Sequence, residues 1–295
     1  MSVERVTIDV DGPVSVLDYG GDGPLLVAVH GLEGSAYNWS LIAPELTKTH
    51  HVVAPDLSGF GYTPPADRGS SVEANVELVA GVIKHYGDSA LVIGNSMGGL
   101  ITILLAELFP DRVSGLVLID PAAPVSTWWT VSPAAAARLS TPLIPVLGSR
   151  AIEAYRSAQT VDERVAEALE FVCADAAALH PEIWEHATEI SQLRESQDWT
   201  TDALVEAVQT IAPYVLRKPR FAKLLHKVSQ PTLVVHGTED RLIQVETARW
   251  IARERPDWTV ALFEGIGHVP MYECPEKLLE VIRAWMDAGA VPATP

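Results

Sequence analysis

Short apolar runs recur along the chain, separated by stretches with helical periodicity. The runs cover residues 25–29, 52–55, 90–93, 113–119, 232–235 and 259–263. Continuous apolar runs of this length are typical of strands buried on both faces of a parallel sheet. Helices are predicted near residues 37–46, 72–86, 100–109, 245–255 and 275–286. The alternation predicts an α/β fold: a mostly parallel sheet of about eight strands with helices on both faces.

The N-terminal region has a different pattern. Residues 3–10 and 14–19 alternate apolar and polar side chains, and Asp11-Gly12-Pro13 separates them. Alternation with a period of two on either side of a turn sequence predicts an antiparallel hairpin.

The strand and helix rhythm stops for about a hundred residues after the run at 113–119. Between residues 121 and 229 the sequence contains helix-forming blocks and no convincing strand. The blocks cover residues 133–139, 161–178, 181–194 and 201–211. We therefore predict a helical cap at residues 122–229, inserted between two parts of a core at 1–121 and 230–295.

The charge and composition of the chain limit the classes of molecule that it is expected to bind. Of the 295 residues, 38 are acidic and 21 basic, and the formal charge of −17 argues against nucleic acid or an anionic membrane surface. Residues 1–11 lack the apolar segment of a signal peptide, and no apolar stretch reaches the ~20 residues of a membrane span. A cytoplasmic protein is expected. Cys173 and Cys274 lack zinc-site spacing, so we expect free thiols and no disulfide, metal or cofactor.

The segment Gly94-Asn95-Ser96-Met97-Gly98-Gly99 lies between the apolar run at 90–93 and a predicted helix. A Gly-x-Ser-x-Gly sequence between a strand and a helix is typical of a sharp turn that exposes a serine nucleophile, here Ser96. The alternative is an ordinary tight turn without chemistry.

A serine nucleophile needs a base and an acid that orients the base. His268 follows the strand at 259–263 in a glycine-bearing loop, so it is the predicted base; a surface histidine beside a turn is the alternative. Asp240, after the strand at 232–235, is the predicted acid. Its competitors are the neighbouring Glu239 and Asp120, which ends the strand at 113–119.

The oxyanion of an acyl-transfer intermediate needs at least two donors. The backbone N–H of Met97 is one candidate, and the N–H of Leu32 is the other, because Gly31 and Gly34 let the loop after residues 25–29 come close. We predict that the His30 side chain only pins this loop.

In these motifs and their order the chain resembles the α/β-hydrolase fold superfamily, in the serine branch with a helical cap. The resemblance rests on the His30-Gly31 loop, the segment 56–61, residues 94–99, Asp240 and Gly267-His268. It implies that Asp56 braces a loop. Epoxide hydrolases and haloalkane dehalogenases carry an aspartate at the nucleophile position, so Ser96 excludes them.

The resemblance implies a carboxylic-ester hydrolase or small lipase that forms an acyl-enzyme on Ser96 and acts on small hydrophobic esters. Carbon–carbon bond hydrolases of aromatic degradation share the run Gly-Asn-Ser-Met-Gly-Gly but usually have more glycines in the oxyanion loop. Cofactor-free haloperoxidases or perhydrolases, and a non-enzymatic ligand receptor, are further alternatives. Trp128 and Trp129 fall in the predicted cap, where they line the substrate pocket or simply pack the cap.

Overall fold

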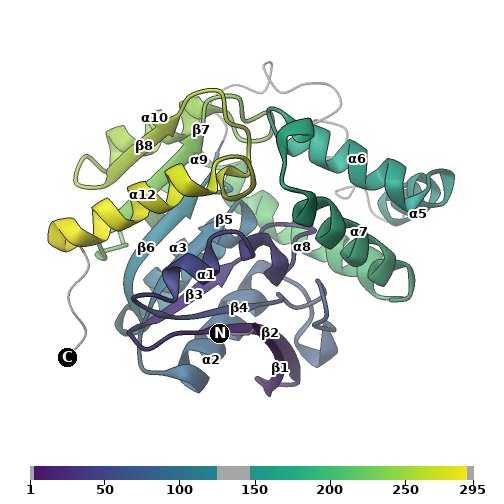
Figure 1. The fold of residues 1–295 in the computed structure, drawn as a ribbon, viewed down its shortest axis with the longest axis horizontal. Helices are drawn as coiled ribbons and strands as arrows, with labels where there is room; N and C mark the ends of the chain where they lie inside the picture. The colour runs from purple at the N-terminus through teal and green to yellow at the C-terminus, as the bar shows by residue number, and fades with distance from the viewer. Residues whose placement is uncertain (1–2, 125–146, 291–295) are drawn as a thin grey trace.

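Eight strands form one sheet in the computed structural model, which describes residues 3–124 and 147–290 (Figure 1). The strands are β1 Glu4–Asp9, β2 Pro13–Gly20, β3 Leu25–Val29, β4 His51–Pro55, β5 Ala90–Asn95, β6 Val113–Ile119, β7 Thr232–Gly237 and β8 Thr259–Phe263. Their order is β1-β2-β4-β3-β5-β6-β7-β8. Strand β2 pairs antiparallel with β1 and β4, and all other neighbours are parallel. The predicted fold class and N-terminal hairpin are confirmed.

Helices cover both faces of the sheet (Figure 1). Helices α2 (Val72–Tyr86), α3 (Met97–Leu108) and α10 (Val245–Glu254) pack on one face. Helices α1 (Ala43–Leu46) and α12 (Pro275–Trp285) pack on the other. Strand β5 contributes to both cores, because Val92 points to the first face and Ile93 to the second. Its unbroken apolar sequence follows from this two-sided burial.

The helix predicted at residues 37–46 is instead two short pieces. A 3₁₀ helix spans Ala36–Trp39, and α1 begins at Ala43 with Pro44 in its first turn. Proline has no N–H and its ring clashes with the carbonyl four residues earlier, so it strongly disfavours the interior of a continuous helix. The prediction overlooked this proline.

The elements described between β6 and β7 are all helices, and Figure 1 shows all but the last of them beside the carboxyl ends of the strands. They are α5 Leu147–Ala158, α6 Val161–Val172, α7 Pro181–Glu195, α8 Thr200–Val215 and α9 Lys218–Leu225. Helix α6 ends earlier than predicted, and α5 and α9 were not predicted. The helix expected at residues 133–139 lies outside the described residues.

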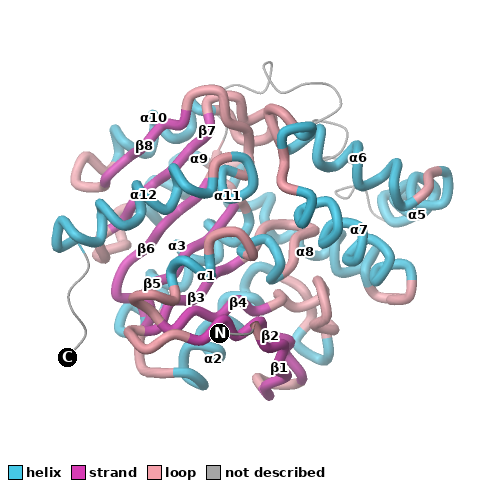
Figure 2. Tube along the Cα trace, in the orientation of Figure 1, coloured by secondary structure: helices cyan, strands magenta, loops and turns pink. Residues whose placement is uncertain are grey.

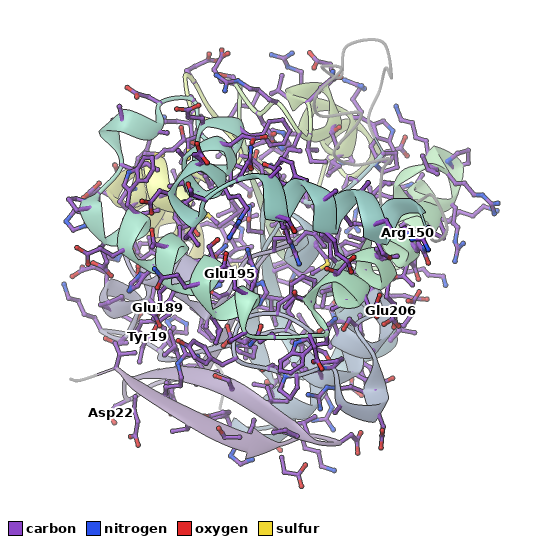
Figure 3. The ribbon with its side chains drawn as sticks, turned by 90° about the vertical axis from the view of Figure 1, so that its right-hand side faces the viewer. Tyr19, Asp22, Arg150, Glu189, Glu195 and Glu206 are labelled. Atoms are coloured by element: carbon purple, nitrogen blue, oxygen red, sulfur yellow. The ribbon has the colours of Figure 1, made fainter. Side chains whose placement is uncertain are left out.

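Helix α8 is fastened to the start of α2. Glu206, labelled in Figure 3, accepts a hydrogen bond from the backbone N–H of Ser70 at 2.8 Å. The Thr210 hydroxyl accepts one from the Val72 N–H at 3.0 Å. The N–H groups at a helix start have no partner within the helix, so side chains of α8 supply acceptors.

Neither cysteine forms a disulfide: Cys173 is buried, Cys274 is half-buried, and both are free thiols. Burial raises the pKa of the Cys274 thiol to about 11.

Within residues 3–124 and 147–290, no helix has both the length and the apolar character needed to cross a membrane.

Candidate active site

The predicted site residues lie in loops that follow five neighbouring strands. The sheet order places β3, β5, β6, β7 and β8 side by side and parallel, so their carboxyl ends share one edge (Figure 2). Leu32, Ser96, Asp120, Asp240 and His268 follow these strands in that order. Residues far apart in the sequence are thereby brought to one edge of the sheet.

Ser96 occupies a strained turn between β5 and α3. Its backbone has φ 54° and ψ −117°, a conformation that residues with side chains rarely adopt, and the residue is half-buried. A Cβ on Gly98 would lie 2.2 Å from the Val29 carbonyl oxygen, so only glycine allows α3 to start here. The turn leaves Ser96 at the start of α3, whose first N–H groups favour negative charge.

His268 and Asp240 form a direct pair. His268 Nδ1 lies 2.6 Å from Asp240 Oδ2, and the two side chains are 5% and 0% exposed. The other carboxylate oxygen accepts the N–H groups of Leu242 at 2.7 Å and Ile243 at 2.9 Å. Burial opposes ionisation of Asp240, but the charge and hydrogen bond of His268 outweigh it and lower the Asp240 pKa. The carboxylate is charged and orients the imidazole.

The two competing acids do not contact His268 in this way. Glu239 is exposed, and its backbone N–H bonds to the Ile266 carbonyl. Asp120 is fully buried, with Oδ1 3.4 Å from Nε2 of His236. The geometry therefore favours Asp240 as the partner of the histidine.

Asn95 connects the serine turn to the histidine loop, a role that the sequence did not suggest. Its side-chain nitrogen donates to the carbonyl oxygens of Ile119 and His268, both at 3.1 Å. A polar residue at the end of the otherwise apolar strand β5 was the available signal. Asn95 sets the position of the His268 backbone relative to the adjacent Ser96.

The loop after β3 packs directly on the serine turn. A Cβ on Gly31 would lie 3.0 Å from the Cβ of Ser96, closer than side chains normally approach. Leu32 follows Gly31 and is half-buried, and Met97 follows Ser96 and is buried. The backbone that carries the two predicted oxyanion donors therefore flanks the serine, and their role stays a prediction.

His30 and Asp56 hold this loop in place. The Nε2 atom of His30 accepts the N–H of Leu57 at 2.9 Å, and Nδ1 donates to the Gly31 carbonyl at 2.7 Å. Burial lowers the His30 pKa to about 4, so the ring is neutral. The Asp56 carboxylate accepts the N–H of Ala36 at 2.7 Å. Both side chains brace the loop, as the sequence predicted.

The helices between β6 and β7 contact the two loops that carry Leu32 and His268. The Arg194 guanidinium donates to the Glu33 carbonyl, and Arg156 Nη2 lies 3.5 Å from Glu33 Oε1. Glu33 directly follows Leu32 and has a positive φ of 55°. On the other side, the His268 N–H donates to the Val172 carbonyl at the end of α6, at 2.7 Å. The sequence did not predict these contacts. Arg156 and Arg194 lie more than a hundred residues from Glu33, and His268 lies in an irregular loop.

Helix α7 makes a second polar contact with the core. Glu189, labelled in Figure 3, accepts hydrogen bonds from the hydroxyls of Tyr37 at 3.0 Å and Tyr62 at 2.5 Å. The Arg5 guanidinium stacks over both tyrosine rings. Since Tyr37 lies in the 3₁₀ helix after the oxyanion loop, α7 is anchored close to the site.

One set of metal-ligating side chain types gathers here among the described residues. One atom each of Asp120, His236 and Asp240 lies within 4.8 Å of the others. Both oxygens of Asp240 already accept N–H groups, and His236 Nε2 is 2.7 Å from the Ile243 carbonyl, to which it donates. Asp120 Oδ1 accepts the Gly237 N–H, and only Asp120 Oδ2 and His236 Nδ1 have no partner among the described residues, so this set fits a largely hydrogen-bonded cluster. Trp128 and Trp129 lie outside the described residues.

Comparison with known proteins identifies the family. The profile of the α/β hydrolase fold family matches residues 24–275, so the chain belongs to this family. It is 27% identical to Lipase 1 of Psychrobacter immobilis over 266 residues, 89% of this chain and 77% of that one. It is 28% identical to the 2-hydroxymuconate semialdehyde hydrolase of Pseudomonas sp. strain CF600 over 286 residues, 93% of this chain and 91% of that one.

A solved structure gives the same result. The crystal structure of a membrane phospholipase A, a bacterial virulence factor, superposes with a TM-score of 0.77 and 27% identity, covering 97% of this chain and 86% of that one. These relatives support hydrolase activity for this chain. They differ in the bond that their names imply, so the substrate has to be inferred from the site.

Proposed function

We propose that the protein is a serine hydrolase of carboxylic esters, with Ser96 as nucleophile, His268 as general base and Asp240 as the acid that orients it. One observation carries the proposal: the buried 2.6 Å contact between His268 and Asp240, on the sheet edge where Ser96 occupies a strained turn. This is the arrangement that activates a serine hydroxyl at neutral pH.

In the acylation step, His268 Nε2 takes the proton of the Ser96 hydroxyl as Oγ attacks the ester carbonyl carbon. The carbonyl oxygen becomes an oxyanion, which the N–H groups of Leu32 and Met97 stabilise. The intermediate collapses when His268 returns the proton to the leaving alcohol. An acyl-enzyme on Ser96 remains.

Deacylation uses the same groups. His268 removes a proton from water, and the hydroxide attacks the acyl carbonyl through a second oxyanion. Ser96 leaves with the proton from His268, and the carboxylic acid is released. Asp240, ionised and buried, stabilises the imidazolium in both steps.

Two further points support a hydrophobic ester as substrate. The names of Lipase 1 and the membrane phospholipase A denote ester hydrolysis. The region 122–229 contributes helices beside the site, and we propose that it forms a cap over the acyl pocket, with Trp128 and Trp129 as candidate lining residues.

A labelling experiment tests the proposal. Wild-type protein should hydrolyse p-nitrophenyl esters and react with a fluorophosphonate probe, and Ser96→Ala should lose both. Ser157→Ala is the matched control, because Ser157 is exposed on α5. Absence of both turnover and labelling in folded wild-type protein would refute the proposal.

A carbon–carbon bond hydrolase is the second candidate, favoured by the 28% identity to the 2-hydroxymuconate semialdehyde hydrolase over nearly the full length of both chains. Ester substrates of rising acyl length should be compared with a ring-fission dienoate. We expect the larger kcat/KM for an ester. A larger value for the dienoate would assign the second function.

A further inference from the structure

Asp120 is a buried carboxyl group that the proposed mechanism does not use. It ends strand β6 in a left-handed conformation with φ 43°, and its side chain is 0% exposed. Oδ1 accepts the backbone N–H of Gly237 at 3.0 Å. Oδ2 is buried and receives no N–H or hydroxyl from the described part of the chain. An ionised carboxylate with one oxygen that lacks a hydrogen-bond donor has a high free energy in a buried site. The protonation state of Asp120 therefore has to be considered.

The neighbours of Asp120 cannot supply the missing proton. His236 Nε2, at 3.4 Å from Oδ1, points its proton at the Ile243 carbonyl 2.7 Å away. Burial lowers the His236 pKa, and its Nδ1 has no hydrogen-bond partner among the described residues, as expected of a neutral ring. The other close group is Asp240, whose carboxylate is itself buried and charged.

Ionisation of both members of a pair of adjacent buried carboxyl groups is energetically unfavourable, because like charges repel strongly where water is excluded. Burial, the charge of Asp240 and a hydrogen bond to Asp240 raise the Asp120 pKa well above its ordinary range, against the Gly237 N–H bond. The titratable groups around Asp120 are His236 and Asp240 from β7 and its loop, and His268 beyond Asp240. Glu273, the last residue of α11 (Pro270–Glu273), and the adjacent Cys274 complete the set. Asp240 is ionised through His268, so Asp120 is the member that keeps its proton.

We propose that Asp120 is a positioning residue of the catalytic site: a neutral carboxylic acid that donates a hydrogen bond to Asp240 and holds this carboxylate against His268. Asp240 then accepts from the backbone on Oδ1, from His268 on Oδ2 and from the Asp120 acid. No proton leaves Asp120 during turnover. The catalytic consequence rests on the proposed function, but the protonation state does not.

Carboxyl ¹³C NMR measures the protonation state directly and needs no substrate. With aspartate-labelled protein, the Asp120 signal, assigned by its loss in Asp120→Asn, should keep the shift of a protonated acid at pH 7. The Asp240 signal should have the shift of a carboxylate. An ionised Asp120 at pH 7 would overturn the proposal whatever the activity of the enzyme.

Two variants then test the positioning role. Asp120→Asn keeps a neutral donor and tolerates the positive φ, so kcat should stay within about threefold and the pH profile of kcat/KM should not move. Asp120→Gly also accepts this φ but removes the donor, so kcat should fall about tenfold, the value of one hydrogen bond to a charged group, with little change in KM.

Two outcomes would contradict the role. If Asp120 were ionised, the Asn variant would remove a negative charge near His268, and the acidic limb of kcat/KM would shift to lower pH. If Asp120→Gly were as active as the wild type, the Asp120 carboxyl group would have no role in positioning Asp240. If the Gly variant fails to fold, the NMR titration of the wild type and the pH profile of Asp120→Asn still decide.

Discussion

Gly98 shows how strictly single residues are determined at the serine turn. A Cβ at this position would lie 2.2 Å from the Val29 carbonyl oxygen and 2.6 Å from that of His30, both backbone atoms that cannot move independently. The sequence indicated a sharp turn between a strand and a helix at residues 94–99. The structure identifies the element that crosses: the end of β3, which carries the oxyanion loop.

Gly98→Ala should therefore be destabilising, because β3 and α3 must separate to accept the methyl group. We expect a loss of about 1–3 kcal/mol in the free energy of unfolding, measured by denaturant titration. Gly87→Ala is the matched control, because its Cβ would lie 3.8 Å from Leu25 Cδ2 in extended backbone. Equal stability of the two variants would show that the turn can relax.

Asp240 is the proposed acid of the triad, and its negative charge is needed to orient and stabilise His268. Asp240→Asn keeps the shape of the side chain but cannot stabilise the imidazolium or enforce the correct tautomer of His268. We expect kcat for an ester to fall on the order of 10³- to 10⁴-fold with the fold intact by circular dichroism. Glu239→Gln, at the exposed neighbouring position, should leave kcat unchanged. Similar rates for Asp240→Asn and wild type would move the acid elsewhere.

At the scale of elements, the helices between β6 and β7 contact the loops that carry Glu33 and His268. Helices α5 and α7 reach Glu33 through Arg156 and Arg194, and the end of α6 accepts the N–H of His268. The sequence predicted helices in this segment from their periodicity. It could not predict these contacts, because a pattern along one helix says nothing about which distant backbone carbonyl an arginine will meet.

Arg194→Gln tests whether α7 sets the geometry of the oxyanion loop. Loss of the bond to the Glu33 carbonyl should let the Leu32 N–H drift, which weakens transition-state binding more than substrate binding. We expect kcat to fall about tenfold and KM to change by less than about twofold, in steady-state assays with a p-nitrophenyl ester.

Arg150→Gln is the control for this experiment, because Arg150 is exposed on the outer helix α5 (Figure 3). It removes the same charge from the same segment. If both variants lost activity equally, the effect would come from the net charge of the helices between β6 and β7 and not from the contact with Glu33.

At the scale of the whole molecule, the strand order of the sheet brings residues that are far apart in the sequence close together in space. Ser96, Asp120, Asp240 and His268 follow β5, β6, β7 and β8, which are consecutive neighbours in the sheet. At this edge the side chains of His268 and Asp240 are almost completely covered, which excludes water from them. The same exclusion of water makes the second buried carboxyl, Asp120, costly to ionise.

This cost should appear in the pH dependence of stability. Because the Asp120 pKa is raised in the folded state, unfolding releases a proton between the unfolded and folded pKa values. The contribution of Asp120 to stability therefore falls as pH rises above about 4, by up to about 1.4 kcal/mol per pH unit for one proton. Asp120→Asn does not titrate, so its stability relative to wild type should increase from pH 5 to pH 8.

Thermal unfolding at several pH values measures this difference. Asp22→Asn is the control, because Asp22 is exposed (Figure 3) and should shift stability little at any pH. A stability difference for Asp120→Asn that does not change with pH would mean that Asp120 has the same protonation state folded and unfolded.

The sequence by itself determined the elements and the chemical groups that follow them. Apolar runs indicate the strands of a parallel sheet, and the serine, aspartate and histidine each follow such a run within five residues. These are local properties, because burial pattern and turn geometry depend on residues close together in the chain. They were enough for the fold class and for choosing Ser96, Asp240 and His268 as candidates.

The tertiary structure decided which groups meet. It paired His268 with Asp240, brought Asn95 to the His268 carbonyl, and placed the buried Asp120 carboxyl close to Asp240. Burial, desolvation and hydrogen bonding across a hundred residues or more depend on how the strands are ordered and covered. No local pattern contains that information, so Asp120 changed from a competitor of Asp240 to its proposed support only once the fold was known.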